Sequence, residues 1–428
     1  MLDGGGRMNA LRIHGGRRLT GEWRVHSAKN AVLPIMAASI LTGEETRLEE
    51  CPELVDVAYM ADILRTLGCR IHSGDGALTI DPQNLNRHEM PDALAKKIRS
   101  SIFLLGSILA RFRKATVTFP GGCEIGLRPI DLHLSGLRQL GVDVREEGGL
   151  IRCDGRHMRA GTVHFDYPSV GATENVMMAA VLLPGTTVIH NPAREPEIAD
   201  LQAFINAMGG KIRGAGTHYI AVEGVERLHG TVWTPMADRI VAGTLLAAAA
   251  ITGGEITLTN APESDMVAVT AKLREMGCRL EERPGWIHLR APKRLTAFAQ
   301  LQTQPHPGFP TDMQAQVCVC MALAGGTSRL TESVYETRFF GYCTELESMG
   351  ASIRISGKTA TVTGVDHLTG STVFAHDLRA GAALVIAGLA ARGTTFVEHI
   401  HFIERGYENL VEKLRALGAD ICRVEDES

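Results

Sequence analysis

The segment from Pro120 to Pro129, Pro-Gly-Gly-Cys-Glu-Ile-Gly-Leu-Arg-Pro, places a thiol close to a cation. Cys123 is followed five residues later by Arg128, and the glycines allow backbone angles that other residues avoid. A neighbouring cation or helix N-terminus lowers the pKa of a thiol and makes its thiolate available near neutral pH. The segment therefore predicts a reactive loop cysteine. The alternative, a small buried apolar residue, stays open at this point.

Charged and polar residues also open six apolar segments that we interpret as buried helices. Helix N-termini carry unpaired N–H groups and partial positive charge, so they favour anions. Several of these positions hold cations instead, which favours an anion-binding site over ordinary helix caps and solvated first-turn residues. The opening residues are Lys29 and Asn30, Arg99, Thr173, Asp238 and Arg239, Asp312, and Asp377 with Arg379.

These segments belong to a sequence repeat. An amphipathic helix that ends in Leu-Gly or Met-Gly, followed by a short strand, occurs six times at spacings of 73, 68, 68, 73 and 68 residues. Each glycine suits the left-handed position that ends a helix. The pattern predicts an α/β protein of two domains, each with three βαβ-type units around central buried helices. The glycines are Gly68, Gly141, Gly209, Gly277, Gly350 and Gly418.

Length and composition agree with two soluble domains. The chain has 428 residues, and this length is too great for one ordinary core. Its composition, 45% hydrophobic and 21% charged, is typical of a globular protein. Its net charge of −4 argues against nucleic-acid binding through phosphates. No apolar run approaches the length that spans a bilayer, and the first residues lack the apolar core of a signal peptide. We expect a cytoplasmic protein with no membrane or nucleic-acid partner.

Cysteine and histidine usage predicts neither disulfides nor a metal site. The nine cysteines are odd in number and include no Cys-x-x-Cys motif, as expected for reduced thiols. The sixteen histidines include no His-Glu-x-x-His motif. We interpret His14, His26, His133 and His190 as hydrogen-bonded loop residues and expect no metal.

Six longer motifs resemble the enolpyruvyl transferase family. The resemblance runs from about Met8 to Val424 and implies two inside-out α/β-barrel domains of three similar units each. It also implies that the N-terminal strand joins the second domain. The boundaries would be 28–237 for one domain and 1–27 plus 238–428 for the other, with the active site in the cleft between them. The motifs lie at 27–34, 120–129, 194–200, 309–316, 377–381 and 405–408.

The resemblance implies a specific reaction. The enolpyruvyl group of phosphoenolpyruvate would pass to the 3′-hydroxyl of UDP-N-acetylglucosamine with release of phosphate, the first committed step of peptidoglycan precursor synthesis. Addition followed by elimination needs a base for the hydroxyl proton, an acid for the methylene carbon, and cations for phosphate and carboxylate. Both partners are small-molecule substrates, and no cofactor is implied.

The family's catalytic roles match four positions. Asp312 matches the base, although it could also be the N-cap or a first-turn carboxylate of the helix that follows. Cys123 matches a loop cysteine that acts as acid or forms a covalent adduct with phosphoenolpyruvate, and that fosfomycin alkylates. Lys29 and Arg405 match groups that bind phosphoenolpyruvate, and an arginine fork suits such anions.

The resemblance also assigns substrate contacts. Phosphoenolpyruvate and the nucleotide sugar would be bound by Lys29, Asn30, Arg99, Arg128, Pro129, Ile130, Asp131, Leu132, Ser169, Val170, Asp312, Val334, Arg379 and Arg405.

One segment departs from the family pattern. Residues 335–343, Tyr-Glu-Thr-Arg-Phe-Phe-Gly-Tyr-Cys, stand where the family usually has Phe-Glu-Asn-Arg-Phe-Met-His, on the nucleotide side. A related transferase with another nucleotide acceptor, or a non-catalytic UDP-sugar-binding relative, therefore stays an alternative. A shikimate acceptor is disfavoured because that branch lacks the cysteine loop, and an RNA-end enzyme because the chain is acidic.

Overall fold

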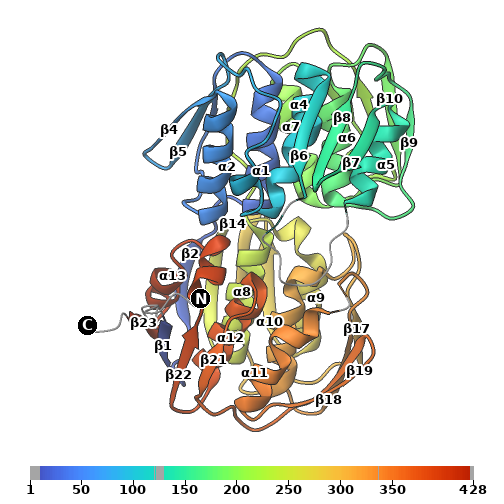
Figure 1. Cartoon of the computed structure of the whole chain (residues 1–428). Coiled ribbons are helices and arrows are strands. Elements are labelled where there is room, and N and C mark those ends of the chain that lie inside the picture. The colour runs from blue at the N-terminus through green and yellow to red at the C-terminus, as the bar shows by residue number, and fades with distance from the viewer. Residues whose placement is uncertain (1–9, 120, 122–129, 336, 425–428) are drawn as a thin grey trace. The chain divides into compact units, whose positions relative to one another are not determined.

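The computed structural model describes residues 10–119, 121, 130–335 and 337–424. The chain divides into two compact units, one of residues 27–236 and one of residues 10–26 with 237–424 (Figure 1). Of the described helices, none is long and apolar enough to cross a membrane.

Three buried helices form the centre of the unit 27–236. They are α1 (Lys29–Ala38), α4 (Leu104–Phe112) and α6 (Val170–Ala180). The helix α4 packs against both α1 and α6. Because these helices are apolar on all sides, they are stable only where other elements cover them completely.

Each buried helix begins a repeat that continues through a strand, a surface helix and a hairpin. The surface helices are α2 (Val55–Leu67), α5 (Asp131–Gln139) and α7 (Pro196–Ala207). Three sheets result, with the orders β13-β3-β5-β4, β6-β8-β7 and β11-β12-β10-β9. Their strands are β3 (Thr46–Leu48), β4 (Arg70–Gly74), β5 (Ala77–Asp81), β6 (Lys114–Thr118), β7 (Asp143–Glu147), β8 (Leu150–Asp154), β9 (Thr162–His164), β10 (Thr186–His190), β11 (Lys211–Arg213), β12 (Tyr219–Glu223) and β13 (Val232–Trp233).

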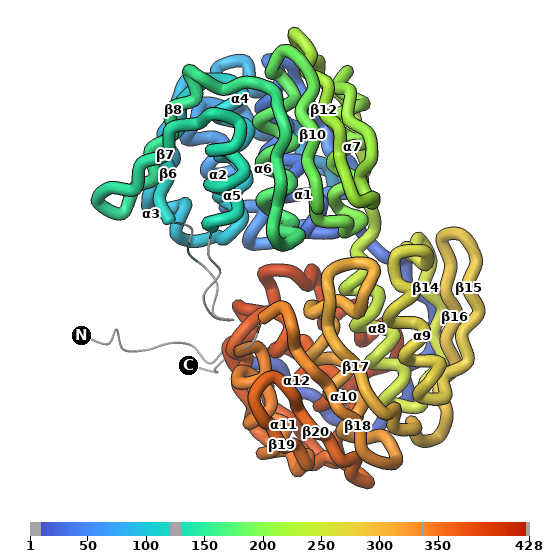
Figure 2. The backbone as a smooth tube through the Cα atoms, turned by 90° about the vertical axis from the view of Figure 1, so that its right-hand side faces the viewer, coloured from blue at the N-terminus to red at the C-terminus, as the bar shows by residue number. Residues whose placement is uncertain are grey.

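The other unit repeats this plan. Its buried helices α8 (Arg239–Ile251), α10 (Gln314–Leu323) and α12 (Leu378–Ala390) contact one another pairwise. The surface helices are α9 (Val267–Glu275), α11 (Cys343–Ser348) and α13 (Leu410–Ala416). The sheets have the orders β15-β16-β14-β2, β17-β18-β20-β19 and β21-β22-β1-β23. Figure 2 shows the tube of this unit wrapped around α8, α10 and α12. The strands are β14 (Glu255–Ala261), β15 (Arg279–Arg283), β16 (Gly285–Arg290), β17 (Gln300–Gln302), β18 (Thr327–Thr331), β19 (Ser352–Ser356), β20 (Thr359–Thr363), β21 (Thr372–Phe374), β22 (Thr394–Glu398) and β23 (Asp420–Val424).

Two N-terminal strands complete sheets of this second unit. The strand β1 (Ala10–His14) lies between β22 and β23 and is antiparallel to both. The strand β2 (Thr20–Arg24) is parallel to β14. The first and last parts of the chain therefore share one sheet.

The repeat pattern is confirmed at the helix ends. The six glycines from Gly68 to Gly418 that end the surface helices all have positive φ, between 88° and 114°. A side chain would strain the backbone at those angles, so the repeated glycine has a conformational reason. The predicted α/β class, with six repeated units around buried helices, is confirmed.

Five local expectations were wrong. Arg99 opens a 3-10 turn, η2 (Arg99–Phe103), and α4 begins only after it. Thr173 lies one turn inside α6, because Ser169 is the N-cap of that helix. Loop positions were predicted for three histidines, but His133 lies buried in α5, and His14 and His190 are the last residues of β1 and β10. The observed helix starts differ from the predicted ones because the apolar periodicity does not show where an N-cap or a 3-10 turn precedes the helix.

Candidate functional site

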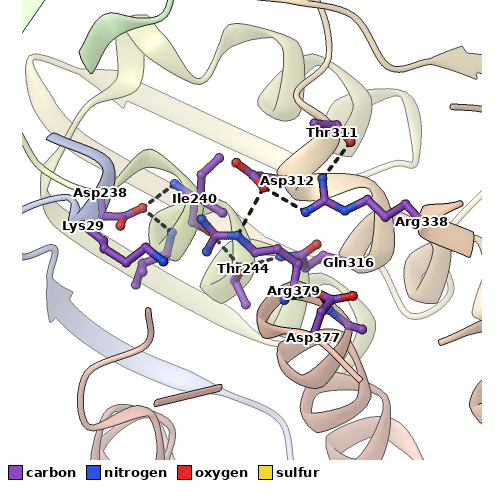
Figure 3. Close-up of polar contacts among 12 residues, drawn as sticks. Lys29, Asp238, Ile240, Thr244, Thr311, Asp312, Gln316, Arg338, Asp377 and Arg379 are labelled. Carbon is purple, nitrogen blue, oxygen red and sulfur yellow. Dashed lines mark hydrogen bonds and ion pairs between the residues drawn. The ribbon is translucent and has the colours of Figure 1, made fainter. Parts of the chain in front are cut away.

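Asp312 stands beside two arginines in the unit that contains residues 237–424. It belongs to a short 3-10 turn, η4 (Thr311–Met313), just before α10. Its Oδ1 lies 3.0 Å from Nη2 of Arg338 and 3.4 Å from Nε of Arg379. Its side chain is 29% exposed, against 3% and 6% for the two arginine side chains. The carboxylate is therefore more exposed than the two cations, whose guanidinium groups both contact it (Figure 3).

The notion that Asp312 is an N-cap is wrong, because the N-cap residues are Pro310 for η4 and Met313 for α10. Its other alternative role is confirmed, since Asp312 is an acidic residue in the first turn of η4. The carboxylate contacts the guanidinium groups of Arg338 and Arg379.

Arg379 is placed by the first turn of α12. Oδ1 of Asp377 accepts the backbone N–H of Arg379 at 2.7 Å and that of Ala380 at 3.0 Å, which caps the helix. The guanidinium also lies 5.5 Å from the centre of the Tyr407 ring. Burial by itself lowers the pKa of Arg379, but the fields of Tyr407 and Asp312 outweigh burial, so this pKa is raised. Arg379 is a permanent cation beside Asp312.

Tyr407 joins the buried helices behind this pair. Its hydroxyl lies 3.0 Å from Oγ1 of Thr244 in α8 and accepts from Nε2 of Gln316 in α10 at 3.2 Å. Tyr407 follows a 3-10 segment, η6 (Ile400–Arg405), which ends at Arg405. The buried hydroxyl network thus ties the segment carrying Arg405 to the helices that follow Asp238 and Asp312.

A second buried network holds Arg338. Nη1 of Arg338 donates to Oγ1 of Thr311 at 2.7 Å, and this hydroxyl donates to Oε2 of Glu332 at 2.9 Å. Glu332 is fully buried, and its Oε1 accepts the backbone N–H of Val334 at 2.7 Å. A buried carboxylate needs such donors, because an unpaired one would be costly.

Lys29 occupies the start of a buried helix in the unit 27–236. It is the first residue of α1, and Asn30 is the second. Nζ of Lys29 donates to Oδ2 of Asp56 at 3.0 Å, with 13% and 5% of the two side chains exposed. In the described structure, α1 has neither a side-chain cap nor an acidic residue in its first turn. The ammonium group and the helix N-terminus therefore both favour an anion.

The other predicted substrate contacts in this unit lie near helix starts. Ser169 caps α6, since its hydroxyl oxygen accepts the Ala172 N–H at 3.4 Å, and Val170 is the first residue of that helix. The remaining predicted positions in the described part of this unit are Arg99 at the start of η2, Ile130 at the N-cap of α5, and Asp131 and Leu132 in its first turn.

His133 is held as a neutral imidazole. Its Nδ1 faces Nδ2 of Asn175 at 2.8 Å, and the same amide group also donates to the carbonyl of Ile102. Because an amide nitrogen donates, Nδ1 of the imidazole accepts. Burial, reinforced by the charge of Arg99, lowers the pKa of His133 to about 3. His133 is therefore a structural link between α5 and α6.

The motif at 194–200 also serves the structure of this unit. Asp200 accepts from Nε1 of Trp233 at 3.2 Å and from the backbone N–H of Met236 at 3.0 Å. Burial raises the pKa of Asp200 to about 6 against the effect of these hydrogen bonds. Glu174 in α6 is fully buried, and burial together with Glu197 raises its pKa well above the usual value. Among the described residues, no group of three His, Cys, Asp or Glu could hold a metal ion.

The structure brings only some of the predicted site residues into contact. Asp312 and Arg379 form an ion pair. Cys123, Arg128 and Pro129 lie outside the described residues. Sequence reasoning missed Asp56, Thr311, Glu332, Arg338 and Tyr407. A signal existed for Arg338, because an arginine occupies the same place in the family pattern of its segment. A signal also existed for Thr311 and Tyr407, which lie inside quoted motifs.

Comparison of the chain with known proteins identifies one family. Residues 13–414 match the family model described as EPSP synthase (3-phosphoshikimate 1-carboxyvinyltransferase). UDP-N-acetylglucosamine 1-carboxyvinyltransferase 2 of Caldanaerobacter subterraneus subsp. tengcongensis is 49% identical over 97% of this chain and 100% of its own. UDP-N-acetylglucosamine 1-carboxyvinyltransferase 1 of Symbiobacterium thermophilum is 50% identical over 96% of this chain and 94% of its own.

Solved structures agree with this match. The enolpyruvyl transferase NikO from Streptomyces tendae superposes with a TM-score of 0.88 and 26% identity, covering 98% of this chain and 100% of its own. EPSP synthase from Acinetobacter baumannii shares the fold, with a TM-score of 0.76 at 18% identity over 97% of this chain and 100% of its own. The repeated fold, the family match along the chain and relatives with about half of their residues in common show that this chain belongs to the EPSP synthase family, in the group of the UDP-N-acetylglucosamine 1-carboxyvinyltransferases.

Proposed function

We propose that the protein transfers the enolpyruvyl group of phosphoenolpyruvate to the 3′-hydroxyl of UDP-N-acetylglucosamine and releases phosphate, an early step of peptidoglycan precursor synthesis. The observation that carries this proposal is Asp312, a partly exposed carboxylate backed by two buried arginines. The names of relatives about 50% identical over nearly the whole chain support the same substrates.

The reaction proceeds by addition and elimination. Asp312 takes the proton of the 3′-hydroxyl as its oxygen bonds to C2 of phosphoenolpyruvate, and Cys123 protonates C3. The resulting tetrahedral intermediate then loses a proton from C3, and its bond from C2 to the phosphate oxygen breaks. The products are the enolpyruvyl ether and inorganic phosphate, so atoms and electrons balance. A positioned base and acid supply such proton transfers.

The cations bind the anionic groups of phosphoenolpyruvate. Lys29 is suited to this role because it sits at the uncapped start of α1, where the helix N-terminus adds partial positive charge. Arg128 and Arg405 supply forks for phosphate and carboxylate oxygens.

Phosphate release from phosphoenolpyruvate with UDP-N-acetylglucosamine tests the proposal. We expect stoichiometric phosphate and a sugar nucleotide heavier by one enolpyruvyl group in mass spectrometry, and a strong loss of rate in Cys123→Ser. Phosphate release with another acceptor only would indicate the related transferase. Tight UDP-N-acetylglucosamine binding without turnover would indicate a non-catalytic relative.

Fosfomycin labelling tests the thiol directly. Burial raises the pKa of Cys69, Cys153 and Cys278 to about 12, so these thiols stay protonated and unreactive near neutral pH. Loss of activity should accompany a mass gain on Cys123, located by peptide mapping, and the partly exposed Cys51 and Cys422 are the internal controls for non-specific labelling. Labelling spread over other cysteines, with Cys123 unmodified, would contradict the role given to this loop.

A further inference from the structure

Two arginines contact the same oxygen of Asp312. Nη2 of Arg338 donates to Oδ1 at 3.0 Å, and Nε of Arg379 forms an ion pair with Oδ1 at 3.4 Å (Figure 3). Contacts from two nearly buried side chains restrict the rotation of the partly exposed carboxylate.

We propose that Arg338 is a positioning residue for the general base, held in place by Thr311 and Glu332. Arg338 donates to Oδ1 of Asp312 and so keeps the carboxylate in one orientation when it accepts the proton of the acceptor hydroxyl. This proposal rests on the proposed function, because it assigns the base role to Asp312.

The direction of each hydrogen bond supports this role. Glu332 is an acceptor only, so the Thr311 hydroxyl must donate to it, and the lone pairs of that hydroxyl remain for Arg338. One arm of the guanidinium is thus held by Thr311 and the other by Asp312. A planar fork can span two acceptors in this way, and the single ammonium of lysine cannot hold the same geometry.

Glu332 also connects this relay to the predicted acceptor contact. Its carboxylate accepts from Oγ1 of Thr303 at 2.7 Å and from the backbone N–H groups of Val334 and Tyr335 at 2.7 and 2.9 Å. The segment after β18 is therefore anchored to the same buried carboxylate as Thr311. Val334 was predicted to contact the sugar nucleotide, so one carboxylate positions both a proposed acceptor contact and the support of the base.

Substitutions of Arg338 provide the first test, with kcat separated from KM. Arg338→Gln should lower kcat roughly 10- to 100-fold, the loss typical of a charged hydrogen bond, and leave KM for phosphoenolpyruvate within about threefold. The kcat of Arg338→Lys should lie between that of the wild type and that of Arg338→Gln. Arg111→Gln is the matched control, because Arg111 is a half-buried arginine that donates to the backbone carbonyls of Ile40 and Thr42. It should keep the kcat of the wild type.

Thr311 separates positioning from bulk stability. Thr311→Val keeps the shape but removes the hydroxyl relay and should lower kcat about fivefold or more, whereas Thr311→Ser should restore it. Thr395→Val is the control, since the buried Thr395 hydroxyl has no hydrogen-bond partner among the described residues and its loss should leave kcat unchanged.

The outcomes separate the two proposals. If the wild type releases phosphate and Arg338→Gln retains its kcat, the positioning role is wrong. Equal losses in Thr311→Val and Thr311→Ser would also overturn it. If the wild type is inactive, the proposed function fails. A crystal structure of Arg338→Gln then tests the positioning alone, since an unrotated Asp312 carboxylate would overturn it and a rotated one would support it.

Discussion

The two units build the same repeat but cap their buried helices differently. In the unit with residues 237–424, the carboxylates of Asp238 and Asp377 cap α8 and α12. In the unit 27–236, α1 begins with Lys29, and Ser169 caps α6 with a neutral hydroxyl. An identical backbone plan therefore carries two different chemistries.

This difference shows how two units with the same fold can take different chemical roles. A carboxylate cap satisfies helix N–H groups internally, so positive charge at such a start has to come from a side chain, as it does from Arg379 in the first turn of α12. An uncapped start with a lysine leaves partial and full positive charge for an anionic ligand. We infer that the unit 27–236 adds a helix N-terminus to the cations that bind phosphoenolpyruvate, and that the other unit holds the base.

The largest expected effect is on the base. Asp312→Asn removes the proton acceptor and should lower kcat by about 100- to 10,000-fold, measured as phosphate release. UDP-N-acetylglucosamine binding by calorimetry should persist, because the arginines and the fold remain. A wild-type kcat in this variant would show that Asp312 is not the base, and it would contradict the assignment of the base to the unit 237–424.

The next effect is on stability in acid and concerns the unit 27–236. The pKa of His133 is about 3 in the folded protein and near 6.5 when unfolded, so the unfolded state binds the extra proton first as pH falls. Stability is thus lost below pH 6.5, by about 2 to 3 kcal/mol at pH 4.5.

Trp233 can report this loss by fluorescence. It lies in the unit 27–236, whereas the other two tryptophans, Trp23 and Trp286, belong to the second unit. Asp200 and Glu174 have raised pKa values and act in the opposite direction, so the effect of His133 is measured as a difference between two proteins. From pH 7 to pH 4.5, a Trp23→Phe, Trp286→Phe protein should lose about 2 to 3 kcal/mol in urea unfolding relative to the same protein with His133→Gln. The same pH dependence with and without His133 would contradict this role of His133.

A smaller effect is expected at the cationic helix start. Lys29→Met should lower kcat/KM for phosphoenolpyruvate roughly 10- to 100-fold, because a charged hydrogen bond to the substrate is lost. Asp56→Asn should cause a milder loss, since the ammonium remains but its 3.0 Å partner is weakened. Steady-state kinetics with each substrate varied gives the result. A rise in KM for UDP-N-acetylglucosamine alone would contradict this prediction, because it would show that Lys29 binds the sugar nucleotide and not phosphoenolpyruvate.

The smallest effects compare the caps themselves. Asp238→Ala removes two side-chain hydrogen bonds to α8, at 2.8 and 2.9 Å, and should cost about 1 to 2 kcal/mol of stability. Ser169→Ala removes one bond of 3.4 Å and should cost about 0.5 to 1 kcal/mol. Thermal unfolding measures both. Equal losses would mean that the carboxylate caps are no stronger than the hydroxyl cap.

Sequence patterns were sufficient for the repeat and for much of the site. The Leu-Gly and Met-Gly endings predicted six positive-φ glycines, and apolar periodicity predicted the buried helices. The same patterns missed Asp56 as the partner of Lys29, because the ion pair joins α1 to α2 across 27 residues with no shared motif. They also suggested a capping role for Asp312, since an acidic residue before a helix usually caps it.

The amino-acid sequence by itself determined the local units: where helices end, which helices are buried, and which residue types open them. These properties depend on periodicity and on the backbone preferences of single residues. Only the tertiary structure decided which side chains meet. Arg338 reaches Asp312 across 26 residues, Tyr407 reaches Thr244 across 163, and β1 pairs with β23 at the other end of the chain. Such contacts form when separate units pack, so no local pattern in the sequence records them.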